Sequence, residues 1–475
     1  MFDVRSLGAT PSDGKNDTAA IQAAIDAAHA AGGGRVVLQE GDYHSGALIL
    51  RSNITFDIQQ GTTLYASPRE EDYPGAEKQL FLAENAENIW VVGPGRIHGS
   101  GTEPLGHQPG RNEPVPPFRV GTLLFKNCRN IHLRDITILF SDSWTVYLQQ
   151  CDGVVIDGIK IQNNYFRTNA DGIDPNSSRN VRITNCNIST GGDCIALEAA
   201  TAMSCENVVV SNCTLRGIGT ALKLGAESAG DFRDIHISNC TIRNTLVGIG
   251  LFMKDGGTME RVSFSNISIE NADPELVALA RDSTFPIFMG IEKRHEDSRL
   301  GVIRDVQFQG IQIETQGSIV VQGTPRAPIE GLTFRDISVR VHKNMDFTQR
   351  GNKVGGNRTT TDDRDRAYAQ FPSYMTLAHV DGLTLDNFRV HVARPVHEGA
   401  PRAAFLGDTV KHGVIQHVEL QPGGVEQRVV LLKDAEDVQV SRPGLGTKNQ
   451  RYLEVTGEKT VDVGLNGARI GTSRK

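Results

Sequence analysis

The sequence has no long hydrophobic run, no excess of positive charge and few aromatic residues. No stretch approaches the roughly 20 apolar residues of a membrane-spanning helix. The 49 Lys and Arg residues are outnumbered by 56 Asp and Glu residues, which gives a net charge of −7, and no cluster of Lys and Arg is long enough for a nucleic-acid footprint. We therefore expect no membrane and no nucleic-acid partner.

The start of the chain, Met1-Phe2-Asp3-Val4, lacks the charged and apolar regions of a secretion signal. This predicts a cytoplasmic protein as the chain is given, or a secreted or periplasmic one if a signal has been removed. The seven cysteines are an odd number in a long chain, which argues against a disulfide framework. Cys186, Cys213 and Cys240 recur every 27 residues, as expected of buried small hydrophobic residues rather than metal ligands. We expect no metal and no cofactor.

What the sequence has in abundance is a repeat. Short segments rich in Val and Ile alternate apolar and polar residues, and five of them start at a spacing of 27 residues, at Gly153, Asn180, Asn207, Asp234 and Arg261. A sixth clear copy begins at Asn130, and fainter copies begin at Asn88, Asp305, Gly331 and Gly382. A period of this length with alternation indicates a solenoid of short strands. We predict an all-β fold, a single-stranded right-handed parallel β-helix of about ten turns, with an asparagine ladder at Asn185, Asn212, Asn239 and Asn266.

The ends of this solenoid differ from its middle. An alanine-rich stretch at about 17–31 begins with Asp17 and stops at Gly32, which predicts an N-capped helix that covers the open end of the β-helix. We assign 1–394 to a catalytic β-helix domain, and 395–475, where the repeat fades, to terminal coils or a C-terminal cap of the same solenoid. The polar stretch 340–369 is expected to be a long loop that walls a groove.

One strand of each turn carries ionisable residues among its apolar ones. Alternation should leave these side chains on the outer face or at strand ends, stacked over a few rungs. Carboxyl groups this close push each other's protonation apart, so one can donate a proton while another stays ionised to activate water. A solvated charged face is the competing interpretation. The residues are Asp171, Asp174, Asp193, Glu198, Lys223, Glu227, Lys254 and Glu292.

Two segments of this set resemble glycoside hydrolase family 28, the polygalacturonases and rhamnogalacturonases. The segment 169–174, Asn-Ala-Asp-Gly-Ile-Asp, is similar to the family's Asn-Thr-Asp motif, and 191–196, Gly-Gly-Asp-Cys-Ile-Ala, is similar to its Gly-Asp-Asp-Cys motif. The resemblance covers roughly residues 2 to 390. It implies a parallel β-helix and a glycosidase in which Asp171 and Asp193 hold the attacking water.

The sequence departs from the family at other motif positions. Gly192 stands where the resemblance implies the general acid, and Thr220 stands at the histidine of the Gly-His-Gly motif. Of the Arg-Ile-Lys motif that grips the sugar carboxylate, Phe252-Met-Lys254 keeps only the lysine. The chain resembles a bacterial branch of the family with altered motifs, and Glu198 or Glu227 is needed as a substitute acid.

Three hypotheses of function follow. The first is a glycosidase that cleaves a pectin-derived or other uronate-containing glycan by inversion, with Asp171 and Asp193 activating water, Asp174 shaping their charge and Glu227 favoured over Glu198 as the acid. The second is a polysaccharide lyase in which Lys223 or Lys254 removes a proton and an acidic cluster binds Ca²⁺. The third is a glycan-binding β-helix with a degenerate site.

The partner in each case is an oligo- or polysaccharide, expected to be acidic. Lys223 and Lys254 would bind an anionic sugar, and Arg294 is a candidate clamp for its carboxylate. Trp144, with Tyr147 in the same segment, could form a platform for stacking a sugar or could pack against its neighbour in the fold. Asn169, from the first motif, and Glu292 complete the expected substrate-binding set.

Overall fold

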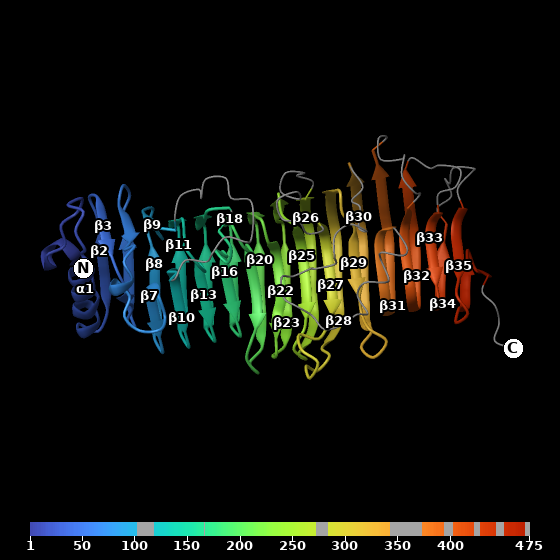
Figure 1. Ribbon diagram of the computed structural model, residues 1–475, viewed down its shortest axis with the longest axis horizontal. Coiled ribbons are helices and arrows are strands. Elements are labelled where there is room, and N and C mark those ends of the chain that lie inside the picture. The colour runs from blue at the N-terminus through green and yellow to red at the C-terminus, as the bar shows by residue number, and fades with distance from the viewer. Residues whose placement is uncertain are drawn as a thin grey trace. The chain divides into compact units, whose positions relative to one another are not determined.

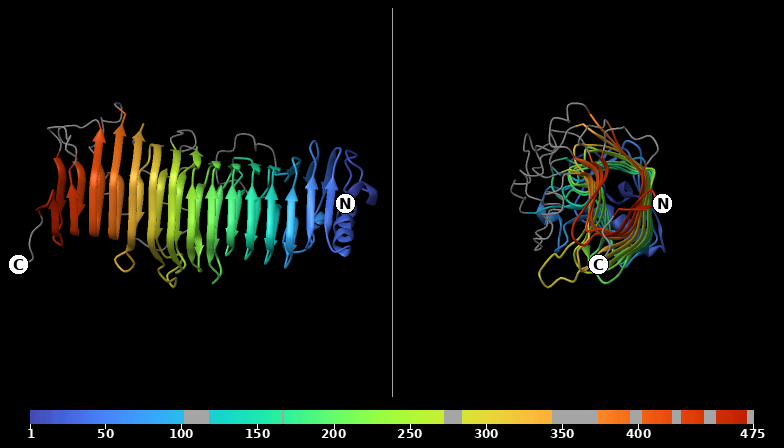
Figure 2. Two further views of the ribbon diagram at one scale, coloured as in Figure 1. Left: turned by 180° about the vertical axis from the view of Figure 1, so that it is seen from behind. Right: turned by 90° about the vertical axis from the view of Figure 1, so that its right-hand side faces the viewer.

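The computed structural model describes residues 1–101, 118–165, 167–271, 284–342, 373–393, 402–421, 428–442 and 451–470. These residues form two compact units, 1–221 and 222–475. In each unit nearly all strands pair in parallel with a strand of the next turn, as Figure 1 and Figure 2 show. The strands of each unit form the rungs of a parallel β-helix, as the repeat predicts.

In residues 1–221 three strand series run along the β-helix. The first contains β2 (Gly34–Leu38), β5 (Ile54–Ile58), β8 (Glu87–Val92), β11 (Arg129–Arg134), β14 (Asp152–Asp157), β17 (Arg179–Thr184) and β20 (Cys205–Ser211). The second contains β3 (Asp42–Ser45), β6 (Thr63–Ala66), β9 (Arg96–His98), β12 (Thr137–Leu139), β15 (Lys160–Gln162), β18 (Asn187–Thr190) and β21 (Thr214–Gly217). The third contains β4 (Leu48–Ile49), β7 (Gln79–Glu84), β10 (Gly121–Lys126), β13 (Val146–Gln149), β16 (Ile173–Asn176) and β19 (Ile195–Ala199).

The remaining elements of this unit lie near its start. They are β1 (Phe2–Asp3), which pairs with β2, the 3-10 turns η1 (Val4–Leu7) and η2 (Glu70–Asp72), and the helix α1 (Thr18–Ala30). Strand β22 (Thr220–Ser228) contains the boundary between the units.

In residues 222–475 several strands are longer than those of the first unit. The strands are β23 (Phe232–Ser238), β24 (Thr241–Arg243), β25 (Val247–Met253), β26 (Thr258–Asn271), β27 (Phe285–Ile291), β28 (Val302–Thr315), β29 (Ile319–Gln322), β30 (Ile329–Val341), β31 (Ser373–Val392), β32 (Ala403–Gln421), β33 (Arg428–Lys433), β34 (Glu436–Ser441), β35 (Arg451–Thr456), β36 (Val461–Leu465) and β37 (Ala468–Arg469). Strand β30 extends through the first residues of the loop predicted at 340–369, and the rest of that loop, from 343, lies outside the described residues. Strands β32 to β36 continue the parallel pairing into the segment predicted as terminal coils or a cap, and the division after residue 394 stays a prediction.

The repeat starts noted in the sequence are backbone corners. All ten of them have a positive φ, for example 57° at Asn180 and 54° at Asp234, and a second corner follows five residues later, as at Asn185 and Asn239. Asn, Asp and Gly tolerate this left-handed conformation better than other residues. The asparagine amides also bind the rung before them: Asn212 Nδ2 donates to Asn185 Oδ1 at 3.3 Å, and Asn266 Nδ2 donates to Asn239 Oδ1 at 2.7 Å.

The core is apolar and includes the cysteines. All seven are buried free thiols. Burial raises the pKa of Cys151, Cys194 and Cys205 to about 12, so these thiols stay protonated and unreactive. This confirms their expected role as small hydrophobic residues.

The N-terminal helix packs Ile21, Ala24, Ile25 and Ala28 against the first turn, as predicted. Its side-chain cap is different from the expected one: Asn16 Oδ1 accepts the N–H of Thr18 at 2.9 Å, while the Asp17 carboxylate accepts the N–H groups of Thr10 and His44. The Asp17 side chain therefore ties two loops together instead of capping the helix.

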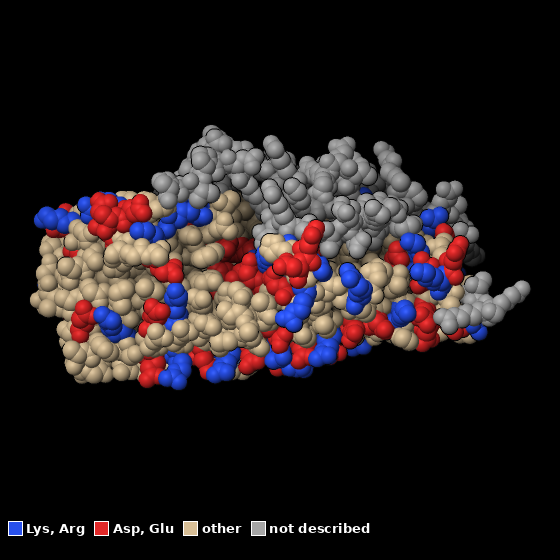
Figure 3. All heavy atoms as spheres, turned by 60° about the horizontal axis from the view of Figure 1, so that its bottom comes forward, with Lys and Arg blue, Asp and Glu red and all other residues tan. Residues whose placement is uncertain are grey.

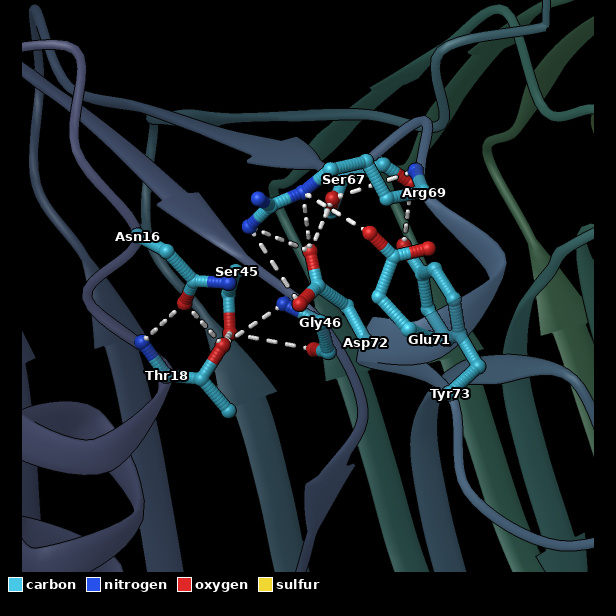
Figure 4. A network of polar contacts seen from close by, with 9 residues as sticks. All are labelled: Asn16, Thr18, Ser45, Gly46, Ser67, Arg69, Glu71, Asp72 and Tyr73. Carbon is cyan, nitrogen blue, oxygen red and sulfur yellow. Dashed lines mark hydrogen bonds and ion pairs between the residues drawn. The ribbon is translucent and has the colours of Figure 1, made fainter.

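Figure 4 shows how the helix start joins the first rungs. Thr18 Oγ1 accepts the N–H of Gly46 at 2.7 Å, and Ala47 N–H donates to the carbonyl of Asp72 at 3.0 Å. Position 46 must be glycine because a Cβ there would lie 2.3 Å from the Asp72 carbonyl oxygen. Gly46 and Ala47 thus connect the helix start to the loop at 67–73.

Charged side chains of both signs are intermixed on the face shown in Figure 3. Many are exposed ion pairs between successive rungs, such as Arg179 with Asp152 at 2.9 Å and Arg261 with Asp234 at 2.7 Å. Such exposed pairs contribute little to stability. Among the described residues, no helix is long and apolar enough to cross a membrane.

Candidate active site

The two aspartates expected to activate water lie in adjacent turns of the first unit, where the second strand series leads into the third. Asp171 precedes β16 and Asp193 precedes β19. The N–H of Asp193 donates to Asp171 Oδ1 at 2.7 Å, and the N–H of Thr220 donates to Asp193 Oδ1 at 2.7 Å. The structure therefore brings Asp171 and Asp193 together and fixes one oxygen of each carboxylate by a backbone donor, which stabilises the anion.

Two glycines make this arrangement possible. A Cβ at Gly192 would lie 1.7 Å from Asp171 Oδ1, and a Cβ at Gly219 would lie 2.5 Å from Asp193 Oδ1. In this chain the Asp171 carboxylate occupies the space that a side chain at 192 would need. The packing of this site therefore leaves no room for a side chain at position 192.

A buried polar network holds the loop of Asp171, and the sequence analysis missed it. Thr145 Oγ1 donates to the carbonyl of Asp171 at 2.6 Å, and Asn163 Nδ2 donates to the carbonyl of Ala170 at 3.0 Å. Asn163 also donates to Thr145 Oγ1 at 2.8 Å. Asn169, expected to bind substrate, is exposed with φ 54° in this loop. The polar residues at the strand ends are visible in the sequence. Their hydrogen-bond partners are not, because these depend on how the turns fold.

Asp174 and Glu198 are on the outward positions of the third series. Asp174 lies beside Tyr147 in register and is only 2% exposed, so it is buried rather than solvated as expected for the outer face. Glu198 is half-buried and accepts the N–H of Asn176 Nδ2 at 3.3 Å. Strand β19 is continuous, without the turn needed to bring Glu198 back toward Asp193, and it carries Glu198 about 10 Å beyond Ile195.

An aromatic pair lies on the same strand series. The rings of Trp144 and Tyr147 stack with centroids 4.8 Å apart and planes at 15°, and Trp144 is 40% exposed. Asn176 Nδ2 donates to the Tyr147 hydroxyl at 2.7 Å, which fixes that ring. Trp144 therefore packs against its neighbour in the fold and also presents its indole to solvent.

In the second unit the expected binding residues form a compact ionic cluster. Lys254 is fully buried and its Nζ lies 3.2 Å from Glu292 Oε2, which is itself 3% exposed. Both were expected on the outer face in contact with substrate, and this placement is corrected: burial makes the pair a structural support of the site. Ser228, which the sequence did not flag, accepts the backbone N–H of Lys254 through Oγ at 2.8 Å.

Arg294 is the centre of the accessible part of this cluster. Its guanidinium binds Asp255 with two hydrogen bonds of 2.7 and 2.9 Å, and Nη2 lies 3.5 Å from Glu227 Oε1. Burial tends to raise the pKa of Asp255, but the hydrogen bonds from Arg294 and the N–H of Ser228 lower it overall. Glu227 is about one third exposed, near the C-terminal end of β22, and Lys223 lies half-buried on the same strand. Within the described residues no group of three His, Cys, Asp or Glu side chains is arranged to hold a metal ion.

Comparison with known proteins identifies the family. Residues 35–354 match the model of the glycosyl hydrolases family 28. The chain belongs to this family. Family 28 relatives include the polygalacturonase of Persea americana, 25% identical over 201 residues, and the endo-polygalacturonase of Pectobacterium carotovorum subsp. carotovorum, 26% identical over 212 residues. The matched segments cover 40% and 39% of this chain, and the chain spans only 42% and 52% of those relatives.

Solved structures confirm the right-handed parallel β-helix. The hyperthermoactive exopolygalacturonase of Thermotoga maritima superposes with a TM-score of 0.60 at 20% identity, over 71% of this chain and 86% of that one. The tailspike protein of E. coli bacteriophage HK620 gives a TM-score of 0.66 at 13% identity, over 98% of this chain and 78% of that one. At these identities the likeness concerns the fold alone.

Proposed function

We propose that this family 28 protein is a glycosidase that hydrolyses a pectin-derived or other uronate-containing glycan with inversion. The observation that carries the proposal is the Asp171 and Asp193 pair, in which backbone donors hold two carboxylates one rung apart. Two fixed anions can accept the protons of one water molecule and direct its oxygen to an anomeric carbon. The polygalacturonase relatives support a pectic substrate.

The proposal assigns the general acid to Glu227. Glu198 is disfavoured because β19 carries it away from Asp193. Glu227 is ion-paired with Arg294 and about one third exposed, so its carboxyl group is accessible to a bound glycan.

The same proposal gives the binding residues distinct tasks. Arg294 and Lys223 would contact the sugar carboxylate, and the exposed indole of Trp144 would stack on a pyranose ring. Asn169 is exposed beside Asp171 and is available to a sugar hydroxyl. Lys254 and Glu292 would support Arg294 from the interior, since Arg294 N–H donates to the Lys254 carbonyl at 3.0 Å.

The acid assignment is tested by substrates with different leaving groups. Glu227→Gln should reduce hydrolysis of natural oligosaccharides by about 10²-fold or more. It should largely spare an aryl glycoside, because a phenolate leaves without a proton. Glu198→Gln is the matched control and should leave the ratio of the two rates unchanged. Equal losses on both substrates for Glu227→Gln would exclude it as the acid.

A second candidate function is glycan binding without turnover. The packing of Asp171 into the space beside Gly192 favours it, because that packing removes the position at which the family carries its acid. Retained binding of acidic oligosaccharides with no new reducing ends would select it. The lyase hypothesis gains no support from Lys254, which is fully buried against Glu292 and so is not accessible to a substrate.

A further inference from the structure

A groove crosses four strands on the outer face of the second unit. It lies over β24, β26, β28 and β30, which pair side by side in this order, and its volume is about 460 Å³. The described residues that line it include none of the candidate active site. The groove is therefore a feature separate from that site.

A row of uncharged polar side chains lines the groove. These side chains occupy one outward position on successive rungs, as the strand registers show. One is half-buried, and the other three are exposed. Within the described part of the chain no hydrogen bond uses them, so their hydroxyl and amide groups are available to a ligand. The row consists of Thr241, Ser268, Gln312 and Ser338.

A second row of side chains, two residues further along each strand, is charged. It consists of Arg243, Glu270, Glu314 and Arg340. Arg243 Nε lies 4.0 Å from Glu270 Oε2. Arg340 Nη1 lies 3.2 Å from Glu314 Oε1. The two positive and two negative charges cancel, and the side chains are 47% to 65% exposed. Exposed ion pairs of this kind are weak, so a ligand can exchange with them at little cost.

The chemistry of the groove disfavours several kinds of ligand. A nucleic acid needs an excess of Lys and Arg along its backbone, and the charges in the groove sum to zero. An extended peptide finds no free strand edge, because β26, β28 and β30 are each paired on both sides. The described lining contains no aromatic and no exposed apolar side chain, so it lacks the anchor pocket typical of a protein partner.

We propose that this groove is a second binding site, for a neutral or sparsely charged glycan chain. Sugar hydroxyls donate and accept hydrogen bonds, as do the hydroxyl and amide groups of the uncharged row. Rungs repeat these groups about every 4.8 Å, so an oligosaccharide laid across the strands meets a polar group on each rung. A fully ionised polyuronate fits less well, because Glu270 and Glu314 are adjacent in the middle of the charged row. The proposal rests on these side chains and not on the proposed hydrolase function.

The next rung shows how the groove can be blocked. Arg389 of β31 pairs in register with Ser338 and is exposed, and the lining of the groove does not extend to it. The row of short polar side chains thus ends where a long cationic one begins. Ser338→Arg moves this end one rung earlier, at an exposed position where the fold should tolerate it.

The test measures retention of the full chain by two polymers, neutral galactan and polygalacturonate, in affinity electrophoresis. Galactan should retard the wild type. Ser338→Arg and Gln312→Ala should weaken this binding about fivefold or more, because the first fills the row and the second removes its amide. Gln307→Ala is the matched control and should equal the wild type, since Gln307 is exposed on the same strand as Gln312 but does not line the groove.

Retention by polygalacturonate should be the same in the wild type and all three variants, and melting temperatures check that each variant is folded. If the wild type hydrolyses no glycan, the proposed function fails while galactan binding still decides the role of the groove. No retention of the wild type by galactan, or equal retention of the wild type, Ser338→Arg and Gln312→Ala, would overturn the proposal. A parallel loss of polygalacturonate binding in the two groove variants would overturn it as well, because the groove would then bind polyuronates.

Discussion

At the scale of single residues, Asp171 and Asp193 accept backbone hydrogen bonds that an asparagine side chain could accept as well. Asparagine Oδ1 can still accept the N–H groups of Asp193 and Thr220, so Asp171→Asn and Asp193→Asn should melt within a few degrees of the wild type. Each should nevertheless reduce hydrolysis by about 10³-fold or more, since an amide cannot act as a base. Asp152→Asn, at a half-buried aspartate paired with Arg179, serves as control. A rate within a few-fold of wild type would show that the water-activating assignment is wrong.

Restoring the family acid should fail at position 192. Because a Cβ there would lie 1.7 Å from Asp171 Oδ1, Gly192→Asp must displace Asp171. Overpacking of this kind costs about 1–3 kcal/mol, and we expect activity to fall as well. Gly192→Ala separates the steric effect from the charge and should lose activity too. Stability by chemical denaturation and initial rates of hydrolysis check both variants, and a gain of activity in Gly192→Asp would contradict the account.

Part of this site could be predicted from the sequence. Asp171 and Asp193 belong to short motifs whose residues are local to one turn, so spacing along the chain sufficed to select them. Thr145 lies 26 residues before Asp171, whose carbonyl it binds, and no local pattern connects the two. The burial of Lys254 depends on its ion pair with Glu292, which lies on another rung. The alternation of inward and outward side chains along a strand predicted that both would lie on the surface.

At the scale of the elements, the left-handed corners determine where rungs turn. Asn266 has φ 54° and donates to Asn239. Asn266→Ala should destabilise the protein by about 1–2 kcal/mol. Alanine is strained in the left-handed conformation, and it also lacks the amide that forms the hydrogen bond. Asn266→Gly should cost less, since glycine adopts this conformation freely. Chemical denaturation of both variants checks the order, and a larger loss for glycine would refute the role of the corner.

Corners also explain which repeats were easy to recognise. Most repeat starts are Asn, Asp or Gly, whereas Arg261 at φ 53° is held by its pair with Asp234. In β32 the corners are His412 and His417, which bind Asp381 and Asp386. Because these corners are not the Asn, Asp or Gly of most other repeats, the repeat fades in the sequence although the strands continue.

The His412 corner should make stability depend on pH. Its hydrogen bond to Asp381 raises the pKa of His412 above the ordinary value of 6.5. A raised pKa in the folded state contributes stability that is fully present below about pH 6.5 and is lost as the pH rises through the folded value. Melting temperatures across pH 5 to 9 should show this loss in the wild type. The loss should be smaller in His412→Asn, and identical profiles would exclude the contribution.

At the scale of the whole molecule, the repeat predicted the β-helix because one period fixes both the strand and the corner of every rung. The chain leaves this pattern at its C-terminal end, where β36 and β37 form an antiparallel hairpin. Asn466 and Gly467 have φ 50° and 81°, the signs required for a tight hairpin turn. The hairpin blocks further strand addition at β36.

Removal of this hairpin should therefore promote association. Deletion of 461–475 would expose the edge of β34, and we expect oligomers or aggregates in light scattering at concentrations where the wild type shows none. Deletion of 471–475 alone retains the hairpin and is the control. Equal behaviour of the two truncations would show that the hairpin does not protect the edge.

The central claim is that this family 28 chain cleaves glycosidic bonds by adding water. The most direct measurement is incubation with a panel of pectic and other acidic oligosaccharides, with ¹H NMR to follow the products and their anomeric configuration. The account predicts that the wild type gives new reducing ends of inverted configuration and no unsaturated sugar. Asp171→Asn and Asp193→Asn should give no new reducing ends. Unsaturated products, or retained binding with no cleavage of any oligosaccharide, would contradict it.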